Sequence, residues 1–195
     1  MEREFDIVLF GATGATGRRA AHHIGARCVE EGLRWAIAGR DREKLEAVRS
    51  TLVPGAQDVP IILCDSHDQA SLLALAARAK VVCSTVGPYA KYGSGLVAAC
   101  VRSGTDYCDL AAEAHWIRKM IDAHQVEAER TGARIIHACG MDSVPSDIGV
   151  WFLQREAKAR RGRTCTDVKM RVTAMKGGFS GGTAASMVYG FEEGR

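Results

Sequence analysis

The sequence predicts an α/β domain in which a doubly wound parallel sheet carries helices on both faces. Apolar, strand-like runs alternate with helical patterns through the first 140 residues. Many of these runs lack polar alternation, as expected of strands that are covered on both faces. Strands that alternate with helices imply βαβ crossovers, and such crossovers produce a parallel sheet.

The predicted elements form one domain over residues 1–140. Six short apolar runs are expected to be strands: 5–10, 34–38, 60–64, 80–86, 106–110 and 134–139. The helical segments between them lie near 17–31, 41–52, 68–79, 93–103 and 113–131. The third of these segments has an apolar face typical of a helix packed on a sheet: Leu72, Leu73, Leu75 and Ala76.

Residues 141–195 are expected to begin a second, α+β domain. Ser146 or Asp147 can cap a helix that runs to about Arg160, and a strand-like run follows at 167–173. A short helical pattern reaches the end of the chain. One strand and two helices cannot enclose a core, so we expect either a fragment or a tail that packs on the first domain or on a partner.

A glycine-rich turn joins the first predicted strand to the first helix. Its spacing is G-x-x-G-x-x-G, which departs from the commonest G-x-G-x-x-G fingerprint. Strand, glycine turn and helix together are the context of a Rossmann-like dinucleotide site, because a pyrophosphate needs unhindered backbone N–H groups and a positive helix end. The alternative is a plain turn. The residues predicted to contact the dinucleotide are Gly11, Thr13, Gly14, Ala15, Thr16 and Gly17.

The end of the second strand favours NADP over NAD. An NAD site has an Asp or Glu near this position to bond the ribose 2′-hydroxyl, whereas Arg40 stands here. A guanidinium pairs with a 2′-phosphate, which a carboxylate would repel. Asp41 either caps the following helix or points at a ribose, and the cap is favoured. A solvated surface arginine is the alternative for Arg40.

The loops after the third and fourth strands supply further candidates, since ligands of this fold lie along the carboxyl ends of the strands. Asp65 and Ser66 are expected at an adenine, although Ser66 or Asp68 can equally cap the next helix. Gly87-Pro88 makes a rigid turn that can lie against ribose and nicotinamide, or serve structure alone. The predicted contacts of this turn are Thr85, Val86, Gly87, Pro88 and Tyr89.

No catalytic residue is assigned. Tyr89-x-Lys91 lacks the Tyr-x-x-x-Lys spacing of short-chain dehydrogenases, so Tyr89 is not assigned as a proton donor. Glu113 and Asp142 are expected at the mouth of the cleft. Tyr92 and Phe179 add apolar surface there, which suits a substrate with little charge.

Composition excludes several classes of protein. A net charge of +3 with no dominant basic run argues against nucleic acid binding. No apolar stretch approaches the roughly 18 residues of a membrane span, and no signal peptide is visible. Seven cysteines without a C-x-x-C pair fit reduced thiols in the cytoplasm, although peripheral membrane association stays open. Histidine spacing predicts no metal site.

Six segments together resemble the saccharopine dehydrogenase-like oxidoreductases, which include the trans-acting enoyl reductases of mycobacterial glycolipid synthesis. They follow the family's order along nearly the whole chain, although Ala15 and Met141 stand where the family usually has Phe. The resemblance implies an N-terminal NADP-binding domain and a larger second domain that forms the substrate cleft and often a homodimer interface. The matching segments are 10–17, 35–40, 86–93, 104–110, 140–147 and 181–186.

The function expected from these observations is an NADPH-dependent oxidoreductase. The resemblance favours reduction of an enoyl or related acyl or lipid intermediate. The first alternative is reduction of an imine formed from an amino acid and an oxo acid, but the loops lack the arginine cluster that several carboxylates would need. The second alternative is a truncated NADP-binding module without catalysis.

Overall fold

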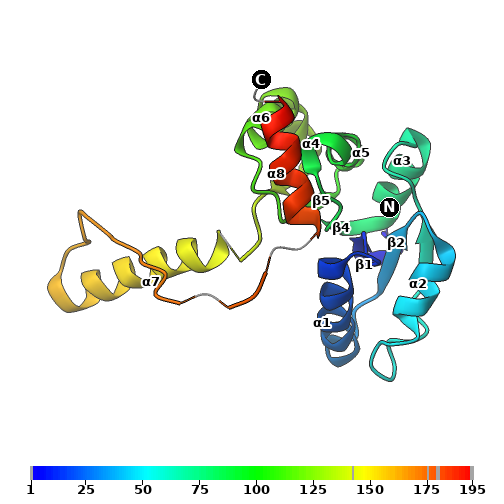
Figure 1. The fold of residues 1–195 in the computed structure, drawn as a ribbon, viewed down its shortest axis with the longest axis horizontal. Coiled ribbons are helices and arrows are strands. Elements are labelled where there is room, and N and C mark those ends of the chain that lie inside the picture. Colours follow the sequence, from blue (N-terminus) through cyan, green and yellow to red (C-terminus); the bar gives the residue numbers. More distant parts are fainter. Residues whose placement is uncertain (1, 142, 175, 179–180, 194–195) are drawn as a thin grey trace.

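A six-stranded parallel sheet forms the centre of the structure, a computed structural model that describes residues 2–141, 143–174, 176–178 and 181–193 (Figure 1). Asp142 and Phe179, both expected at the cleft, lie outside these residues. The strand order is β3-β2-β1-β4-β5-β6, which confirms the predicted doubly wound fold. The strands are β1 (Phe5–Phe10), β2 (Trp35–Gly39), β3 (Ile61–Leu63), β4 (Ala79–Ser84), β5 (Asp106–Asp109) and β6 (Ile135–Ile136).

Helices cover the sheet on both faces. On one face, α1 (Ala15–Glu31) and α2 (Arg42–Arg49) enclose a core with Leu9 and Ile37. On the other, the core contains Val8 and Val82 together with residues of α3 (Gln69–Arg78), α5 (Ser94–Ser103) and α6 (Ala114–Thr131). The one-turn helix α4 (Tyr89–Tyr92) precedes α5. Neighbouring residues of β1 therefore enter different cores, as the two-residue period of a strand requires.

Local capping sets where several helices begin and end. Asp41 accepts a hydrogen bond from the backbone N–H of Lys44 at 3.1 Å, so the favoured capping interpretation of Asp41 is confirmed. Asp68 accepts from the N–H of Ala70 at 3.0 Å and caps α3. Glycines with positive φ stop α1, α5 and α6 at positions 32, 104 and 132.

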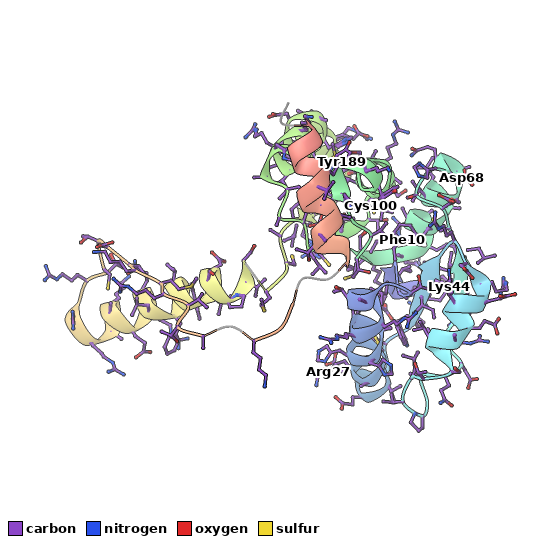
Figure 2. The ribbon with its side chains drawn as sticks, in the orientation of Figure 1. Phe10, Arg27, Lys44, Asp68, Cys100 and Tyr189 are labelled. Atoms are coloured by element: carbon purple, nitrogen blue, oxygen red, sulfur yellow. The ribbon has the colours of Figure 1, made fainter. Side chains whose placement is uncertain are left out.

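The described residues after position 140 add no strand to the sheet. Helix α7 (Val144–Arg161) projects from the α/β body, and no residue of it is buried (Figures 1 and 2). The prediction of a strand at 167–173 is wrong, because this segment is irregular and its residues Met170 and Val172 are exposed. No neighbouring backbone pairs with it within the described residues, and a strand forms only when one does. Helix α8 (Gly181–Glu193) follows and returns to the α/β body (Figure 1), where the hydroxyl of Ser186 donates to Glu113, the residue that precedes α6.

Each described helix is too short or too polar to pass through a bilayer. Within the described ranges, no group of three or more His, Cys, Asp or Glu side chains is arranged to hold a metal ion. All seven cysteines are free thiols, and Cys28, Cys64 and Cys100 are buried.

Asp6 gives the fold an acid-sensitive contact at the amino end of β1. Its carboxylate binds the Lys80 ammonium at 2.7 Å and accepts from the N–H of Arg34 at 2.8 Å. The hydrogen bond from Lys80, helped by the one from Arg34, lowers the pKa of Asp6 from 3.8 to about 2. Because the folded-state pKa lies below the unfolded one, this stabilisation is complete above pH 4 and is lost as the pH falls toward 2.

We therefore expect Asp6→Asn to reduce the free energy of unfolding near neutral pH by roughly 1 kcal/mol or less. The variant should also lose less stability than the parent between pH 5 and pH 3, which urea unfolding at the two pH values measures. The matched control is Asp58→Asn, which removes an exposed carboxylate that makes no ion pair among the described residues. Equal acid sensitivity of the parent and Asp6→Asn would contradict the assignment.

Candidate functional site

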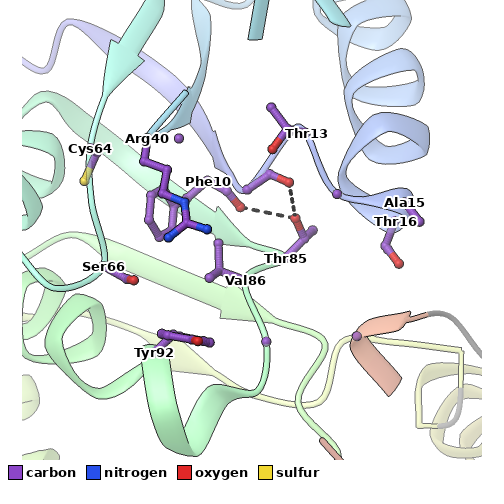
Figure 3. Close-up of a pocket in the computed structure, with 15 residues that line it drawn as sticks. Phe10, Thr13, Ala15, Thr16, Arg40, Cys64, Ser66, Thr85, Val86 and Tyr92 are labelled. Carbon is purple, nitrogen blue, oxygen red and sulfur yellow. Dashed lines mark hydrogen bonds between the residues drawn. The ribbon is translucent and has the colours of Figure 1, made fainter. Parts of the chain in front are cut away.

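A pocket of about 310 Å³ opens at the carboxyl ends of β1 to β4. This edge is where the sheet reverses its strand order, because β2 and β4 lie on opposite sides of β1. Figure 3 shows the lining residues converging from the ends of the strands and from α4. They are Phe10, Gly11, Thr13, Gly14, Ala15, Thr16, Gly39, Arg40, Cys64, Ser66, Thr85, Val86, Gly87, Tyr92 and Gly182.

The glycine turn is held by contacts that leave no room for side chains at two of its positions. Gly11 has φ +91°, and a Cβ there would lie 2.6 Å from Cγ2 of Val86. A Cβ on Gly17 would lie 2.0 Å from the carbonyl oxygen of Gly11. Thr85 donates its hydroxyl proton toward the carbonyls of Phe10 at 3.2 Å and Gly11 at 3.1 Å (Figure 3). These contacts fix the turn against β4.

Gly14 differs from these two glycines because its open side faces the pocket. It is the N-cap residue of α1, with extended backbone, and a Cβ there would meet only the Gly11 carbonyl oxygen, at 3.6 Å. The first turn of α1 contains no acidic residue and no side-chain cap. The amides of Ala15, Thr16 and Gly17 lack intrahelical acceptors, so the positive end of the helix is directed at the pocket. Gly17 itself packs against the carbonyl group of Gly11 and does not line the pocket.

Arg40 supplies an unneutralised charge on the wall that follows β2. Figure 3 shows its guanidinium directed into the pocket on the side of Ser66 and Val86. No acidic side chain pairs with it in the part of the chain that the structure describes. The two nearby cations are engaged instead: Arg42 pairs with Glu46 at 3.8 Å, and Lys44 with Asp41 at 3.0 Å. Arg40 is thus available to an anion from outside the chain.

The loop after β3 places only one of its two predicted residues in the pocket. Ser66 lines the pocket, whereas Asp65 does not, because its carboxylate accepts a hydrogen bond from the N–H of His67 at 2.9 Å within its own turn. The ring of His67 meets the ring of Tyr92 edge-on, with centroids 5.4 Å apart. This contact joins the loop to α4 and makes Tyr92 part of the wall.

Three of the five residues predicted in the turn after β4 line the pocket, and two do not. Thr85, Val86 and Gly87 line the pocket, while Pro88, which follows a cis peptide bond, does not. Tyr89 is buried; its hydroxyl donates to the carbonyl of Ser84 at 3.1 Å and accepts from the N–H of Leu110 at 3.2 Å. Burial raises the pKa of Tyr89, so its hydroxyl holds the turn and does not face a ligand.

Five of the residues that line the pocket are not among those predicted from sequence to contact the cofactor. Phe10, Gly39 and Cys64 end β1 and β2 or follow β3, so the rule that ligands lie at strand ends points to them. Tyr92 was expected beside the substrate instead. Gly182 belongs to α8, and no local pattern shows that this helix returns to the sheet.

A buried polar cluster lies beside the pocket but does not open into it. Asp109, at the end of β5, binds Nδ1 of His137 at 2.6 Å and accepts from the N–H groups of Ala111 and Ala138. The His137 ring packs edge-on against Trp116, with centroids 5.0 Å apart. Both members of the Asp109–His137 pair are shielded from solvent, so the pair acts in the packing of β5, β6 and α6.

Residues 7–136 match the family described as the saccharopine dehydrogenase NADP binding domain. The chain belongs to this family. As a saccharopine dehydrogenase NADP-binding domain it takes NADP as its cofactor. The glycine turn offers backbone amides for a pyrophosphate, and Arg40 offers an unpaired guanidinium for a 2′-phosphate.

Relatives of this NADP-binding domain are known in mycobacteria. A protein of Mycobacterium leprae named trans-acting enoyl reductase is 49% identical over 187 residues, which cover 95% of this chain and 44% of that protein. A protein of the same name from Mycobacterium tuberculosis is 48% identical, with the same coverage. The chain therefore spans less than half the length of the curated relatives it matches.

A solved structure shows the same fold. It is apo saccharopine dehydrogenase (L-Glu forming) from Saccharomyces cerevisiae, with a TM-score of 0.61 and 18% identity. The match covers 81% of this chain and 32% of the yeast chain.

Proposed function

We propose that this chain is the cofactor-binding part of an NADPH-dependent reductase that acts on an enoyl intermediate of acyl or lipid metabolism. The observation that carries the proposal is the pocket itself, where an unpaired Arg40 and the uncapped start of α1 face one space. When bound, the cofactor supplies a hydride. The extensive identity with the mycobacterial enoyl reductases supports the substrate class.

Each wall of the pocket has a proposed task. The amides of Ala15 and Thr16 bind the pyrophosphate, with Gly11, Gly14 and Gly17 shaping the turn and Thr13 beside it. Arg40 binds the 2′-phosphate. Ser66 and Tyr92 form the adenine side, and the segment Thr85–Gly87 forms the nicotinamide side. We assign Asp65, Pro88 and Tyr89 to the support of these walls, since their groups bond within the chain or lie outside the lining.

The rest of the expected organisation belongs to the same proposal. Residues 141–195 begin a substrate domain, as the exposed apolar side chains of α7, among them Trp151 and Phe152, support. A homodimer through that domain and a cytoplasmic location are proposed with it. The seven free thiols support the location.

The test measures hydride transfer directly. The purified chain is titrated with NADPH, followed by nicotinamide fluorescence, and then mixed with C4-deuterated NADPH and a long-chain trans-2-enoyl thioester. We expect NADPH binding and a saturated thioester that carries deuterium at the β-carbon and a solvent proton at the α-carbon. Mass spectrometry of the acyl chain detects both positions.

A parallel reaction with an amino acid and a 2-oxo acid covers imine reduction. Deuterium in the amine product and none in the thioester would mean that the substrate is an imine and not an enoyl thioester. NADPH binding without hydride transfer to either substrate would support the alternative that the chain is an NADP-binding module without catalysis. Absence of NADPH binding would contradict the proposed function as a whole.

A further inference from the structure

Glu113 makes three hydrogen bonds that join separate parts of the chain. Its Oε1 accepts from the N–H of Tyr89 and from the hydroxyl of Ser186, both at 2.9 Å. Its Oε2 accepts from the N–H of Ala90 at 2.8 Å. The side chain is partly buried. One carboxylate thus binds the start of α4 and the middle of α8.

The position of Glu113 favours a capping role at the start of α6, but its side chain does not have that role. Glu113 is the N-cap residue of α6, yet its carboxylate makes no capping bond to that helix. It reaches across to α4 instead, where two amides need an acceptor. Around it, the ring of Tyr89 stacks on Trp116 with centroids 5.6 Å apart, and Nε1 of Trp116 donates to the hydroxyl of Ser94 at 2.9 Å. The start of α6 therefore holds the turn that carries Thr85–Gly87.

The bond to Ser186 brings α8 to the same turn. A Cβ built on Gly87 would lie 3.8 Å from Oγ of Ser186, so the pocket-lining turn and α8 are in contact there. Gly182, four residues earlier on α8, lines the pocket. The turn after β4 and helix α8 therefore meet at the pocket, and Glu113 hydrogen-bonds to α4, which follows that turn, and to α8.

We propose that Glu113 is a positioning residue that couples the docking of α8 to the binding of NADPH. It fixes the turn after β4 through the amides of α4, and it fixes α8 through Ser186, so that Gly182 completes the pocket wall. Coupling between two events is reciprocal, so NADPH must then stabilise the docked position of α8. The inference rests on the proposed function, because it takes the pocket as the NADPH site.

The first variant is Ser186→Ala, which removes the bond to α8 and leaves the bonds to α4. We expect its dissociation constant for NADPH to rise about three- to tenfold, which corresponds to the net contribution of one ordinary hydrogen bond. In the parent chain, NADPH should slow amide hydrogen exchange in α8. In Ser186→Ala this slowing should be largely lost, an effect that a purely structural contact would not produce.

A double-mutant cycle with Glu113→Ala isolates the coupling. Once Glu113 is absent, adding Ser186→Ala should weaken NADPH binding no further, because both substitutions remove the same bond. Glu113→Gln keeps an oxygen that accepts from Tyr89 and Ser186, so we expect partial recovery of affinity relative to Glu113→Ala. The matched control is Glu129→Ala on the exposed part of α6, which should leave affinity and exchange in α8 at parental values.

The outcomes separate this inference from the proposed function. If the parent binds NADPH but Ser186→Ala matches it in affinity and in the exchange of α8, the coupling is overturned and the cofactor site stands. Additive effects in the cycle would overturn it equally. If the parent does not bind NADPH, the proposed function fails first. Should Glu113→Ala fail to fold, Ser186→Ala alone decides.

Discussion

Arg40→Asp is expected to weaken NADPH binding roughly 100-fold while sparing or improving NADH binding. The reason is the uncompensated charge of Arg40: its guanidinium faces the pocket with no carboxylate partner among the described residues. A charge-assisted bond to a phosphate contributes about 1.5–3 kcal/mol, and an Asp in its place adds repulsion. A carboxylate at this strand end is also the group that bonds a free ribose 2′-hydroxyl.

Fluorescence titration with both nucleotides measures the change, and competition by 2′-phospho-ADP-ribose against ADP-ribose isolates the 2′-phosphate. Arg42→Asp is the matched control, since it makes the same change in net charge two residues away at a cation already paired with Glu46. We expect it to shift NADPH affinity less than about threefold, as for a screened surface charge. Unchanged NADPH affinity in Arg40→Asp would place the 2′-phosphate elsewhere.

Gly17→Ala is expected to disrupt the turn itself. Its Cβ would lie 2.0 Å from the carbonyl oxygen and 2.9 Å from the carbonyl carbon of Gly11, both backbone atoms that a rotamer change cannot move. The first turn of α1 must shift, so we expect a loss of about 1–3 kcal/mol or more in the free energy of unfolding. NADPH binding should fall below detection, because the amides that face the pocket move with the helix.

Gly14→Val is the matched comparison, because it adds a larger side chain where the structure has space. The backbone at Gly14 is extended, with φ −70° and ψ 166°, and a Cβ meets nothing closer than 3.6 Å. Thermal unfolding should stay close to that of the parent, while NADPH affinity falls at least about 100-fold through loss of two charge-assisted bonds. Retained affinity in Gly14→Val, or parental stability in Gly17→Ala, would contradict this division of roles.

The fold was largely readable from sequence because its determinants are local. Unbroken apolar runs located the strands to within a few residues; the run expected at 34–38, for example, forms β2 at Trp35–Gly39. Asp41 could be recognised as a cap because its partner, the amide of Lys44, is three residues away. The segment 167–173 shows the limit of such reasoning, since its pattern is local but a strand requires a neighbour.

The candidate site was readable where it follows a strand end and hidden where it depends on tertiary contacts. Arg40, Ser66 and Thr85, each predicted as a contact after a strand end, line the pocket. The inward position of Tyr89 could not be foreseen, because Ser84 and Leu110 determine it across two strands. The contribution of Gly182 depends on where α8 lies, and no residue spacing encodes that.

The central place of β1 bears on how the chain reaches this structure. Phe10 pairs in register with Ala38 of β2 and with Ser84 of β4, so β1, which precedes both in the sequence, needs partners on both sides. At about 5–20 residues per second, the chain between Phe10 and Ser84 takes roughly 4 to 15 s to emerge from a ribosome. During that interval Val8 and Leu9, later inaccessible to water, have no completed sheet to enter. The nascent chain thus passes through a period in which β1, which has neighbours on both sides in the finished sheet, lacks one of them.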